Sequence, residues 1–477
     1  MSIIIPANSA AGGGLGYQVA NGVRFDDGSS SNFSDGSAPG GNRQKFTWSA
    51  WVKRSSLSSI QTLVSCSYSA NDQGFLIFSN GDKLSWESNN SGDGDLNTNK
   101  LFRDTSAWYH IVFSVDTTQG TAANRIKLYI NGSQYVWDGN TTYPNQNQSL
   151  YFNVGGSYNT YIGRRAQGDY FDGYMSEIVF INDAQLAADS FGEFDSDSGV
   201  WKPLESVEDL TFGTSGYYLN FQNSGALGTD VSGIGNTFTA NNIAAVDQTT
   251  DTCTNNFATM NPLSFNTGFT LSEGNTFFNG GSVTSWNQGC AATMGASSGK
   301  WYWEVKWING TSVSIIGVLP IDQSYYTTGG GGSTSVYNFS NGWQLSTSGA
   351  GDKYNYVASN GTGFQRAHDD IIMFAMDMDN KKMWSGANGT WYSSGNPATG
   401  ANPTWETSQF PTIFDNGFIP YCQSYNSGVV TEFAFNFGNP SFTGTDKEDG
   451  NNRGSFEYTP PSGYLSLCTL NLSEVLS

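Results

Sequence analysis

The chain has 477 residues, and at about 100–200 residues per domain this length predicts two or three domains. Glycine contributes 58 residues and aromatic residues 14% of the chain, whereas charged residues reach only 13%, which excludes a disordered chain and is not typical of a helical bundle. Asp and Glu outnumber Lys and Arg by 41 to 21, and the net charge of −20 argues against binding to nucleic acid or to an anionic membrane surface. We therefore expect a soluble all-β protein in which Gly, Asn, Ser and Asp supply the turns.

No apolar run reaches the ~20 residues of a membrane helix, and the five cysteines show no CxxC spacing, which disfavours structural zinc and a disulfide framework. The first residues lack the basic region of a signal peptide, and the apolar run of Ile3, Ile4 and Ile5 stops at Pro6. We therefore expect synthesis in the cytoplasm with reduced thiols. Residues 1–22 form the expected N-terminal arm, which is either a disordered tail or a segment that becomes ordered on a partner.

The first expected domain, residues 23–201, carries the alternating patterns of β-strands. Residues 46–52 place Phe, Trp, Ala and Val on one face. Asn-Gly pairs at 80–81 and 131–132 lie between apolar runs, and such pairs predict tight hairpins because both central residues need positive φ. Residues 183–194 are predicted to form the one helix of this domain.

Residues 202–256 differ from the segments on either side, because they are rich in Gly, Asn, Thr and Asp with evenly spaced apolar residues. We interpret them as an ordered connector between domains. The second expected domain is residues 257–477. Its strand at 300–307 has three Trp and one Val on one face, which predicts the deep core of a second β-sandwich.

The first domain resembles the laminin-G-like, concanavalin A-like jelly rolls. The resemblance rests on the ordered motifs FTWSAWV (46–52), WYHIVF (108–113), KLYING (127–132), YIG (161–163) and FDGYMSEI (171–178). It covers most of residues 23–200 and implies the fold without naming the ligand.

The second domain resembles SPRY domains, which are also β-sandwiches. The ordered motifs are GKWYWEV (299–305), IGV (316–318), MFAMDMDNKKMW (373–384), FIPY (418–421), FNFG (435–438) and PSGY (461–464). This resemblance implies a non-catalytic domain that recognises partners through loops at one end of the sandwich.

The segment between the domains resembles a linker of virion proteins from marine tailed phages. The carrying residues are YLNF (218–221), ALG (226–228), residues 230–238 and DTCTNNFATMNP (251–262). The resemblance implies a place on the surface of a phage particle, assembled in the host cytoplasm. In that setting Ile3, Ile4, Ile5 and Pro6 are the candidate anchor to other virion subunits.

Candidate chemistry is sparse. A glycosidase on a concanavalin A-like fold needs two carboxylates across the scissile bond, and no Glu-x-Asp-x-x-Glu run is present. His110 lies inside a predicted strand and His368 at a strand entrance, so neither is expected to act as a catalytic base. No cofactor is expected. Asp93 and Asp95 are the candidate ligands for a Ca²⁺ ion, with acidic turn residues as the simpler interpretation.

Sugar binding needs aromatic rings that stack on pyranose faces and polar groups that bind hydroxyls. The pair Arg164 and Arg165 is unusual in so acidic a chain and suits a carboxylate on a partner or on a uronic acid. The candidate aromatic residues share predicted loop positions, where packing is the alternative role: Tyr143, Tyr158, Tyr170, Tyr325, Tyr326, Trp391 and Trp405.

Together these observations predict a non-enzymatic phage virion protein of two β-sandwiches, displayed as a tail fibre, spike or head decoration. We expect it to bind a host-surface glycan or protein, to contact other virion subunits and to form a homo-oligomer if it is a fibre. It is not expected to bind nucleic acid or to insert into a membrane. One alternative is a purely structural subunit that binds no host ligand. Another is a polysaccharide depolymerase.

Overall fold

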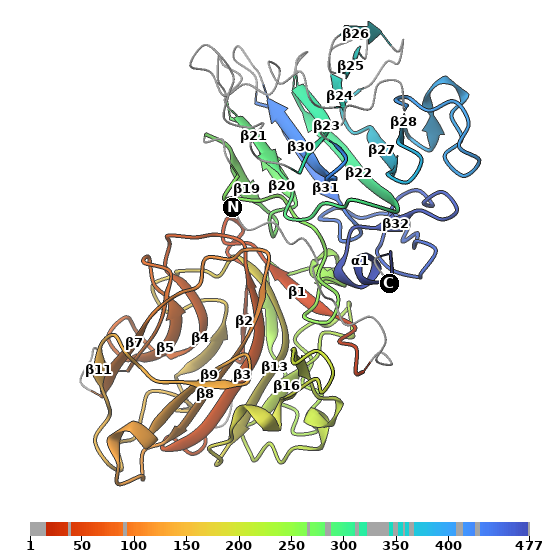
Figure 1. Ribbon diagram of the computed structural model, residues 1–477. Coiled ribbons are helices and arrows are strands. Elements are labelled where there is room, and N and C mark those ends of the chain that lie inside the picture. Colours follow the sequence, from red (N-terminus) through yellow and green to blue (C-terminus); the bar gives the residue numbers. More distant parts are fainter. Residues whose placement is uncertain are drawn as a thin grey trace. The chain divides into compact units, whose positions relative to one another are not determined.

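Figure 1 shows the computed structural model of the chain, whose regular secondary structure is almost entirely β-strand. It describes residues 16–36, 40–88, 93–264, 268–281, 288–310, 314–321, 343–346, 352–355, 358–361, 367–406, 414–424 and 430–475. Strands account for 42% of the chain and helices for 6%, which confirms the predicted all-β class. None of the helices within these ranges has the length and hydropathy of a membrane span. The chain divides into two compact units between Asn255 and Asn256.

The first unit contains two eight-stranded antiparallel sheets and one small hairpin. The sheet that we call the first sheet has the order β10 (Ser133–Tyr135), β9 (Ile126–Ile130), β8 (Trp108–Asp116), β3 (Lys45–Arg54), β13 (Gly173–Asn182), β1 (Gly22–Phe25) and β18 (Gln248–Thr249), with β16 (Tyr217–Leu219) beside β13. The second sheet has the order β11 (Thr141–Thr142), β7 (Gly94–Leu101), β6 (Lys83–Ser88), β5 (Gln73–Phe78), β4 (Gln61–Ser67), β12 (Asn159–Ile162), β2 (Asn32–Ser34) and β17 (Thr239–Asn241). The hairpin pairs β14 (Gly192–Phe194) with β15 (Trp201–Pro203).

The core of the first unit lies between the two sheets. The predicted inward face of β3 is confirmed, since Phe46, Trp48, Ala50 and Val52 are all fully buried. Trp86 from the second sheet packs on Phe113 from the first, with ring centroids 5.9 Å apart. The two sheets therefore form the expected sandwich.

The first sheet is buried on its other face as well. Every residue of β3 except the first is buried, including the outward-pointing Ser49, Trp51 and Lys53. Segments between Ala184 and Phe212 cover this outward face and add a second apolar layer against Val112 and its neighbours. Two-sided burial explains why β3 and β13 contain so few exposed polar residues.

A fully buried ion pair joins the residues after β18 to the outward side of β3. The Nζ atom of Lys53 on β3 lies 2.8 Å from the Asp251 carboxylate, and both side chains are almost completely removed from solvent. The indole Nε1 of Trp108 donates to the other carboxylate oxygen at 3.1 Å. The Lys53 ammonium also lies 5.3 Å from the centre of the Tyr174 ring. Because each charge has a partner, removal of either one leaves the other buried without compensation.

Two local expectations need correction or restatement. The helix predicted at residues 183–194 is replaced by one 3₁₀ turn (Ala188–Ser190) and β14, because backbone groups at Ala184 and Leu186 bond to the Thr47 and Ser114 side chains of the first sheet instead of to a helix. The hairpin between β5 and β6 is present, but its positive φ falls at Asp82 and not at the Asn-Gly pair.

The second Asn-Gly turn and the expected connector also have clear outcomes. At Asn131-Gly132 both residues have positive φ, 48° and 79°, and they join β9 to β10 as expected for a two-residue turn. Residues 202–256, expected to be a connector, supply β16 and β18 to the first sheet and β17 to the second. This part of the chain also contains the 3₁₀ turns Glu205–Asp209 and Ala245–Asp247. Another 3₁₀ turn of this unit, Ala122–Asn124, precedes β9.

The second unit also contains two sheets around one core. One sheet has the order β19 (Thr270–Ser272), β20 (Phe277–Asn279), β31 (Glu432–Asn436), β22 (Lys300–Asn309), β27 (Ile371–Asp377), β28 (Lys382–Ala387) and β29 (Thr390–Trp391), with β32 (Leu465–Ser466) parallel to β22. The other has the order β21 (Gln288–Ala291), β30 (Phe418–Ser424), β23 (Ser314–Pro320), β24 (Trp343–Ser346), β25 (Asp352–Asn355) and β26 (Ala358–Gly361). A 3₁₀ turn (Tyr392–Ser394) follows β29, and the helix α1 (Thr469–Val475) follows β32.

The tryptophan face predicted on β22 forms the centre of this second core. Trp303 is stacked on Phe374 at 5.2 Å and on Phe418 at 5.9 Å, so it joins both sheets. On the opposite face of β22, the buried Glu304 carboxylate accepts hydrogen bonds from the Tyr302 hydroxyl at 2.8 Å and from the Tyr458 backbone N–H at 2.8 Å. Glu304 thereby fastens the segment before α1 to the sheet.

We predict that Lys53→Met lowers the free energy of unfolding by about 3–5 kcal/mol, because the Asp251 carboxylate stays buried without its counter-charge. Lys202→Met is the control, since Lys202 pairs with Glu193 and Asp195 at the surface and such pairs contribute less than about 1 kcal/mol. Equilibrium denaturation of the full chain measures both values. Equal stability of the two variants would contradict the role given to the buried pair.

Candidate functional site

The second sheet is accessible to solvent on one face along β6 and β7, whereas every residue of β4 and β5 is buried. In β6, Leu84 and Trp86 point into the core, whereas Ser85 and Glu87 point outward and are half-buried. The same alternation holds in β7, where Asp95 points outward. We call this side of the second sheet the outward face. Since the first sheet is covered on both sides and β4 and β5 are buried throughout, a ligand can reach the outward face at β6, β7 and β12.

Strand register aligns five outward side chains in one row across this face. Tyr161 of β12 is opposite Ser65 of β4, Ser65 is opposite Phe75 of β5, Phe75 is opposite Glu87, and Glu87 is opposite Asp95. At ~4.8 Å between neighbouring strands, four spacings make the row about 19 Å long. The row has aromatic residues at one end and two carboxylates at the other.

Two arginines lie over the aromatic end of the row. The Arg164 guanidinium lies 4.6 Å from the centre of the Tyr161 ring and 5.6 Å from that of Tyr170. The Arg165 guanidinium lies 4.6 Å from the centre of the Phe75 ring. Such contacts are cation–π interactions, and they hold planar guanidinium groups in fixed positions. Three of the predicted ligand-binding residues, Arg164, Arg165 and Tyr170, are therefore brought together.

The loop of residues 163–170 positions both arginines. Gly163 has φ of 84°, and a Cβ atom there would lie 2.7 Å from the Phe25 ring, so the turn into the loop requires glycine. The loop closes on itself through paired backbone hydrogen bonds between Arg165 and Gly168. It is fixed to β4 by the Ser65 hydroxyl, which donates to the Arg164 carbonyl oxygen at 2.8 Å.

Tyr158 belongs to a neighbouring aromatic group. Its ring centroid lies 5.6 Å from that of Tyr68 and 5.8 Å from that of Tyr151. Tyr68 is 63% exposed, so this group presents apolar surface to solvent. The side-chain amide of Gln167 donates to the carbonyl oxygen of Ala70 at 3.1 Å. It thereby links the loop of residues 163–170, which we call the arginine loop, to the turn between β4 and β5.

The other predicted aromatic residues do not join this site. Tyr143 is half-buried against the first core. Trp391 packs against Tyr302 in the second unit, with centroids 6.4 Å apart. Trp405 was expected in a loop, but it is fully buried and its backbone pairs with that of Met383, so it has no surface for a ligand. The remaining predicted positions lie outside the residues that the structure describes: Tyr325, Tyr326 and the anchor Ile3, Ile4, Ile5 and Pro6.

Both histidines are engaged in packing. His110 is buried between Trp51 and Trp201, with centroid distances of 4.7 and 5.8 Å. Its Nδ1 accepts a hydrogen bond from the Trp201 indole at 3.0 Å, so Nε2 carries the proton and donates to the Ser49 hydroxyl at 2.9 Å. The Nε2 atom of the exposed His368 is 2.9 Å from the carbonyl oxygen of Gly310. His110 therefore has no free nitrogen to act as a base.

The two carboxylates proposed for Ca²⁺ have separate amide partners. The Asp93 carboxylate accepts a hydrogen bond from Gln148 at 2.9 Å, and that of Asp95 accepts one from Asn140. Across the described ranges, no group of three or more His, Cys, Asp or Glu residues is arranged to hold a metal ion. Ca²⁺ binding at Asp93 and Asp95 stays a prediction.

The pairing of Glu87 with Asp95 is not predicted by the sequence. A run of acidic residues on one strand is absent, but these two carboxylates lie opposite each other on adjacent strands. The alternating patterns of residues 83–88 and 94–101 indicate which of their residues point outward, but they do not reveal that the strands are neighbours. Tyr161 and Phe75 were missed for the same reason.

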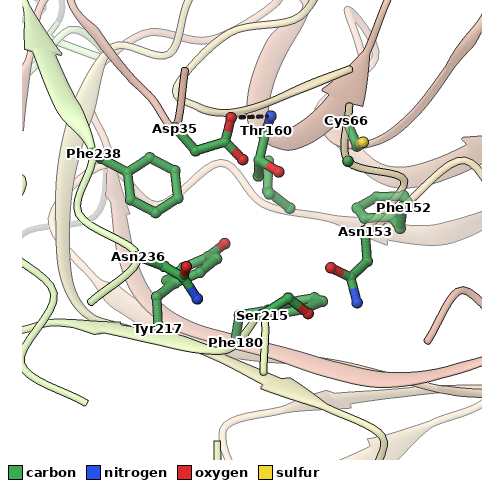
Figure 2. Close-up of a pocket in the computed structure, with 12 residues that line it drawn as sticks. Asp35, Cys66, Phe152, Asn153, Thr160, Phe180, Ser215, Tyr217, Asn236 and Phe238 are labelled. Atoms are coloured by element: carbon green, nitrogen blue, oxygen red, sulfur yellow. Dashed lines mark hydrogen bonds between the residues drawn. The ribbon is translucent and has the colours of Figure 1, made fainter. Parts of the chain in front are cut away.

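A small cavity lies inside the first unit, between the two sheets (Figure 2). It measures about 20 Å³, which is room for about one water molecule and too small for a sugar. Figure 2 shows Ser215, Tyr217, Asn153 and Asn236 around it. The hydroxyls of Ser215 and Tyr217 are buried and make no hydrogen bond of standard geometry, although the Trp48 indole lies near Tyr217.

Comparisons with known proteins support the jelly roll. Residues 25–189 match the family described as the concanavalin A-like lectin/glucanases superfamily, which confirms the fold predicted for the first unit. No curated protein matches the chain.

Similar solved structures include a putative carbohydrate-binding protein from Bacteroides ovatus, at 18% identity and a TM-score of 0.33, covering 48% of this chain and 60% of that one. They also include the SPRY domain of human HERC1, at 14% identity and a TM-score of 0.25, covering 35% of this chain and 92% of that one. A third is a pentraxin from Limulus polyphemus, at 17% identity and a TM-score of 0.25, covering 36% and 75%. The SPRY resemblance of the second unit stays a prediction.

We predict that one water molecule fills the cavity, so that Tyr217→Phe and Ser215→Ala each destabilise the protein by about 1–2 kcal/mol through lost hydrogen bonds. Tyr143→Phe, at a half-buried tyrosine outside the cavity, is the control and should change stability by less than about 0.5 kcal/mol. Thermal or chemical unfolding measures the changes. If the cavity is dry, both substitutions leave the free energy of unfolding unchanged or raise it, because each removes a buried hydroxyl that has no hydrogen bond.

The pH dependence of stability tests the environment of His110. Complete burial lowers the pKa of His110 from 6.5 to about 3. Below about pH 6.5 the His110 imidazole is therefore protonated in the unfolded chain but stays neutral in the folded chain. The free energy of unfolding consequently falls as the pH drops from about 6.5 toward 3, by up to about 1.4 kcal/mol per pH unit.

In His110→Gln this contribution is absent. Denaturation curves between about pH 4 and 6 should then show a shallower loss of stability in the variant, while the carboxylates contribute equally to both proteins. Parallel pH profiles would show that His110 is not held neutral by burial.

Proposed function

We propose that the first unit is a non-enzymatic carbohydrate-binding module that holds an extended glycan across the outward face of the second sheet. The observation that carries the proposal is the row from Tyr161 to Asp95, with half-buried Tyr161 and Tyr170 at one end and carboxylates at the other. Aromatic rings stack on the apolar faces of pyranoses, and carboxylates accept hydrogen bonds from sugar hydroxyls. The family match over residues 25–189 supports a lectin-like role.

A polymer fits this face better than a small molecule. The accessible side chains of the row lie toward its two ends, about 14–19 Å apart, with the buried Ser65 and Phe75 beneath the arginine loop between them, whereas the enclosed cavity of the same unit measures about 20 Å³. The net charge of −20 also favours ligands that are mostly neutral over nucleic acids. The surface therefore suits successive sugar residues of one chain.

One observation favours a second candidate function, a polysaccharide depolymerase. Glu87 and Asp95 are cross-strand neighbours on the outward face, and opposed carboxylates are the catalytic groups of glycoside hydrolases. Release of new reducing ends from a bound polysaccharide, lost in Glu87→Gln, would establish this function. A module that only binds releases none.

We also propose that the module is displayed on a phage particle, as a tail fibre, spike or head decoration, and there contacts other virion subunits and the host surface. The support is the resemblance of residues 218–262 to the linker of phage virion proteins. Antibodies against this chain should label purified particles in electron micrographs. Particles that carry the chain but show no host-glycan binding would favour the purely structural alternative.

We predict that Tyr161→Ala weakens glycan binding about three- to tenfold, because a stacked aromatic ring contributes about 0.5–1.5 kcal/mol beyond burial. A glycan array identifies the ligand, and titration calorimetry then compares the variants. Tyr135→Ala, on the edge strand of the first sheet, is the matched control and should bind as the unchanged protein does. Unchanged affinity in Tyr161→Ala would place the binding site elsewhere.

A further inference from the structure

Arg164 is held in place by groups that leave its outer nitrogens available. Its guanidinium contacts the rings of Tyr161 and Tyr170, and its Nε donates to the carbonyl oxygen of Arg165 at 3.3 Å. Among the residues that the structure describes, no carboxylate forms an ion pair with Arg164. Its neighbour Arg165 differs, because Asp169 lies 2.7 Å from the Nε atom of Arg165.

The environment of Arg164 is that of a preorganised anion receptor. A guanidinium stacked on tyrosines loses little conformational entropy when it binds, since its position is already fixed. Its two terminal amino groups form a planar fork, which matches the two oxygens of a carboxylate. The chain carries 41 acidic against 21 basic side chains, and Arg164 is one of several described basic residues that form no ion pair; what distinguishes it is its contact with two tyrosine rings.

The opposite end of the row limits how much negative charge a ligand can carry. Glu87 and Asp95 lie three and four strand spacings from Tyr161, which is about 14 and 19 Å. A second anionic group at that end would meet two carboxylates at short range. Neutral sugars instead offer hydroxyl groups that donate hydrogen bonds to them. The face therefore has a direction, with an anion at the Arg164 end and neutral residues at the other.

We infer that the ligand of the outward face is an acidic oligosaccharide whose carboxylate is bound by the Arg164 fork and whose neutral residues extend toward Glu87 and Asp95. This inference rests on the proposed function, because it names the ligand class of the same site. A heavily sulfated polymer fits less well, since its repeated charges meet the carboxylate end and the overall negative charge of the protein.

Titration calorimetry with matched oligosaccharides tests the inference. The probes are oligomers of galacturonate, mannuronate and glucuronate in mixed chains with neutral sugars, the same oligomers after reduction of their carboxyl groups, and a sulfated carrageenan oligomer. We expect the acidic form of the ligand to bind at least about tenfold more tightly than its reduced form. Raising the salt concentration should remove part of this preference but leave binding of the reduced form unchanged.

Substitutions of Arg164 test whether this residue causes the tighter binding of the acidic form. Arg164→Gln should bring the acidic and reduced forms to within about twofold of each other, and Arg164→Lys should restore only part of the preference, because it keeps the charge but loses the fork. Lys127→Gln removes one positive charge from β9 of the first sheet and should leave the preference unchanged.

Failure of the inference is distinguishable from failure of the proposed function. If acidic and reduced oligomers bind equally well, or if Arg164→Gln retains the preference, the face binds glycan but Arg164 does not select a carboxylate. Tighter binding of the sulfated oligomer would replace the carboxylate by a sulfate. If no oligosaccharide of either kind binds, the proposed function itself is wrong.

Discussion

Burial of the first sheet on both of its faces is the constraint on which the first unit depends. The inward face of β3 packs on the second sheet through Trp48, and its outward face is closed by the segments between Ala184 and Phe212 and by Asp251, which pairs with Lys53. A buried pair of this kind adds little net stability compared with apolar packing, but it is costly to break and it admits few alternative arrangements. With both faces of one sheet occupied, the half-buried side chains of β6, β7 and β12 on the outward face of the second sheet are the sheet surface left for recognition.

The chemistry of that surface follows from non-local register. Tyr161 lies far in the sequence from Phe75 and Glu87, which belong to consecutive strands, and pairing through β4 places all three in one row. The loop after β12 then lays Arg164 and Arg165 over the aromatic part. A single loop thus places two positive charges over the aromatic part of the row, and the two carboxylates across the sheet give the surface a direction.

The sequence predicts those features that depend on a few consecutive residues. Alternation identifies the buried face of β3 and the tryptophan face of β22, and Asn131-Gly132 marks its turn because both residues adopt positive φ. Features that depend on distant partners are not predicted. Trp405 is in a segment with loop-like composition yet is fully buried, and residues 183–194 lose their helix to hydrogen bonds with side chains of the first sheet. Glu87 and Asp95 lie on consecutive strands, but alternation alone does not set the register that pairs them.

The central claim is that a glycan lies along the outward face with its carboxylate on Arg164. A crystal structure of the full chain with a bound acidic oligosaccharide tests it most directly. We expect a carboxylate within hydrogen-bond distance of the Arg164 terminal nitrogens, a sugar ring over Tyr161 and neutral residues that extend toward Glu87 and Asp95. A ligand bound at the loops of the second unit, or at the Tyr68 group with Arg164 untouched, would contradict it.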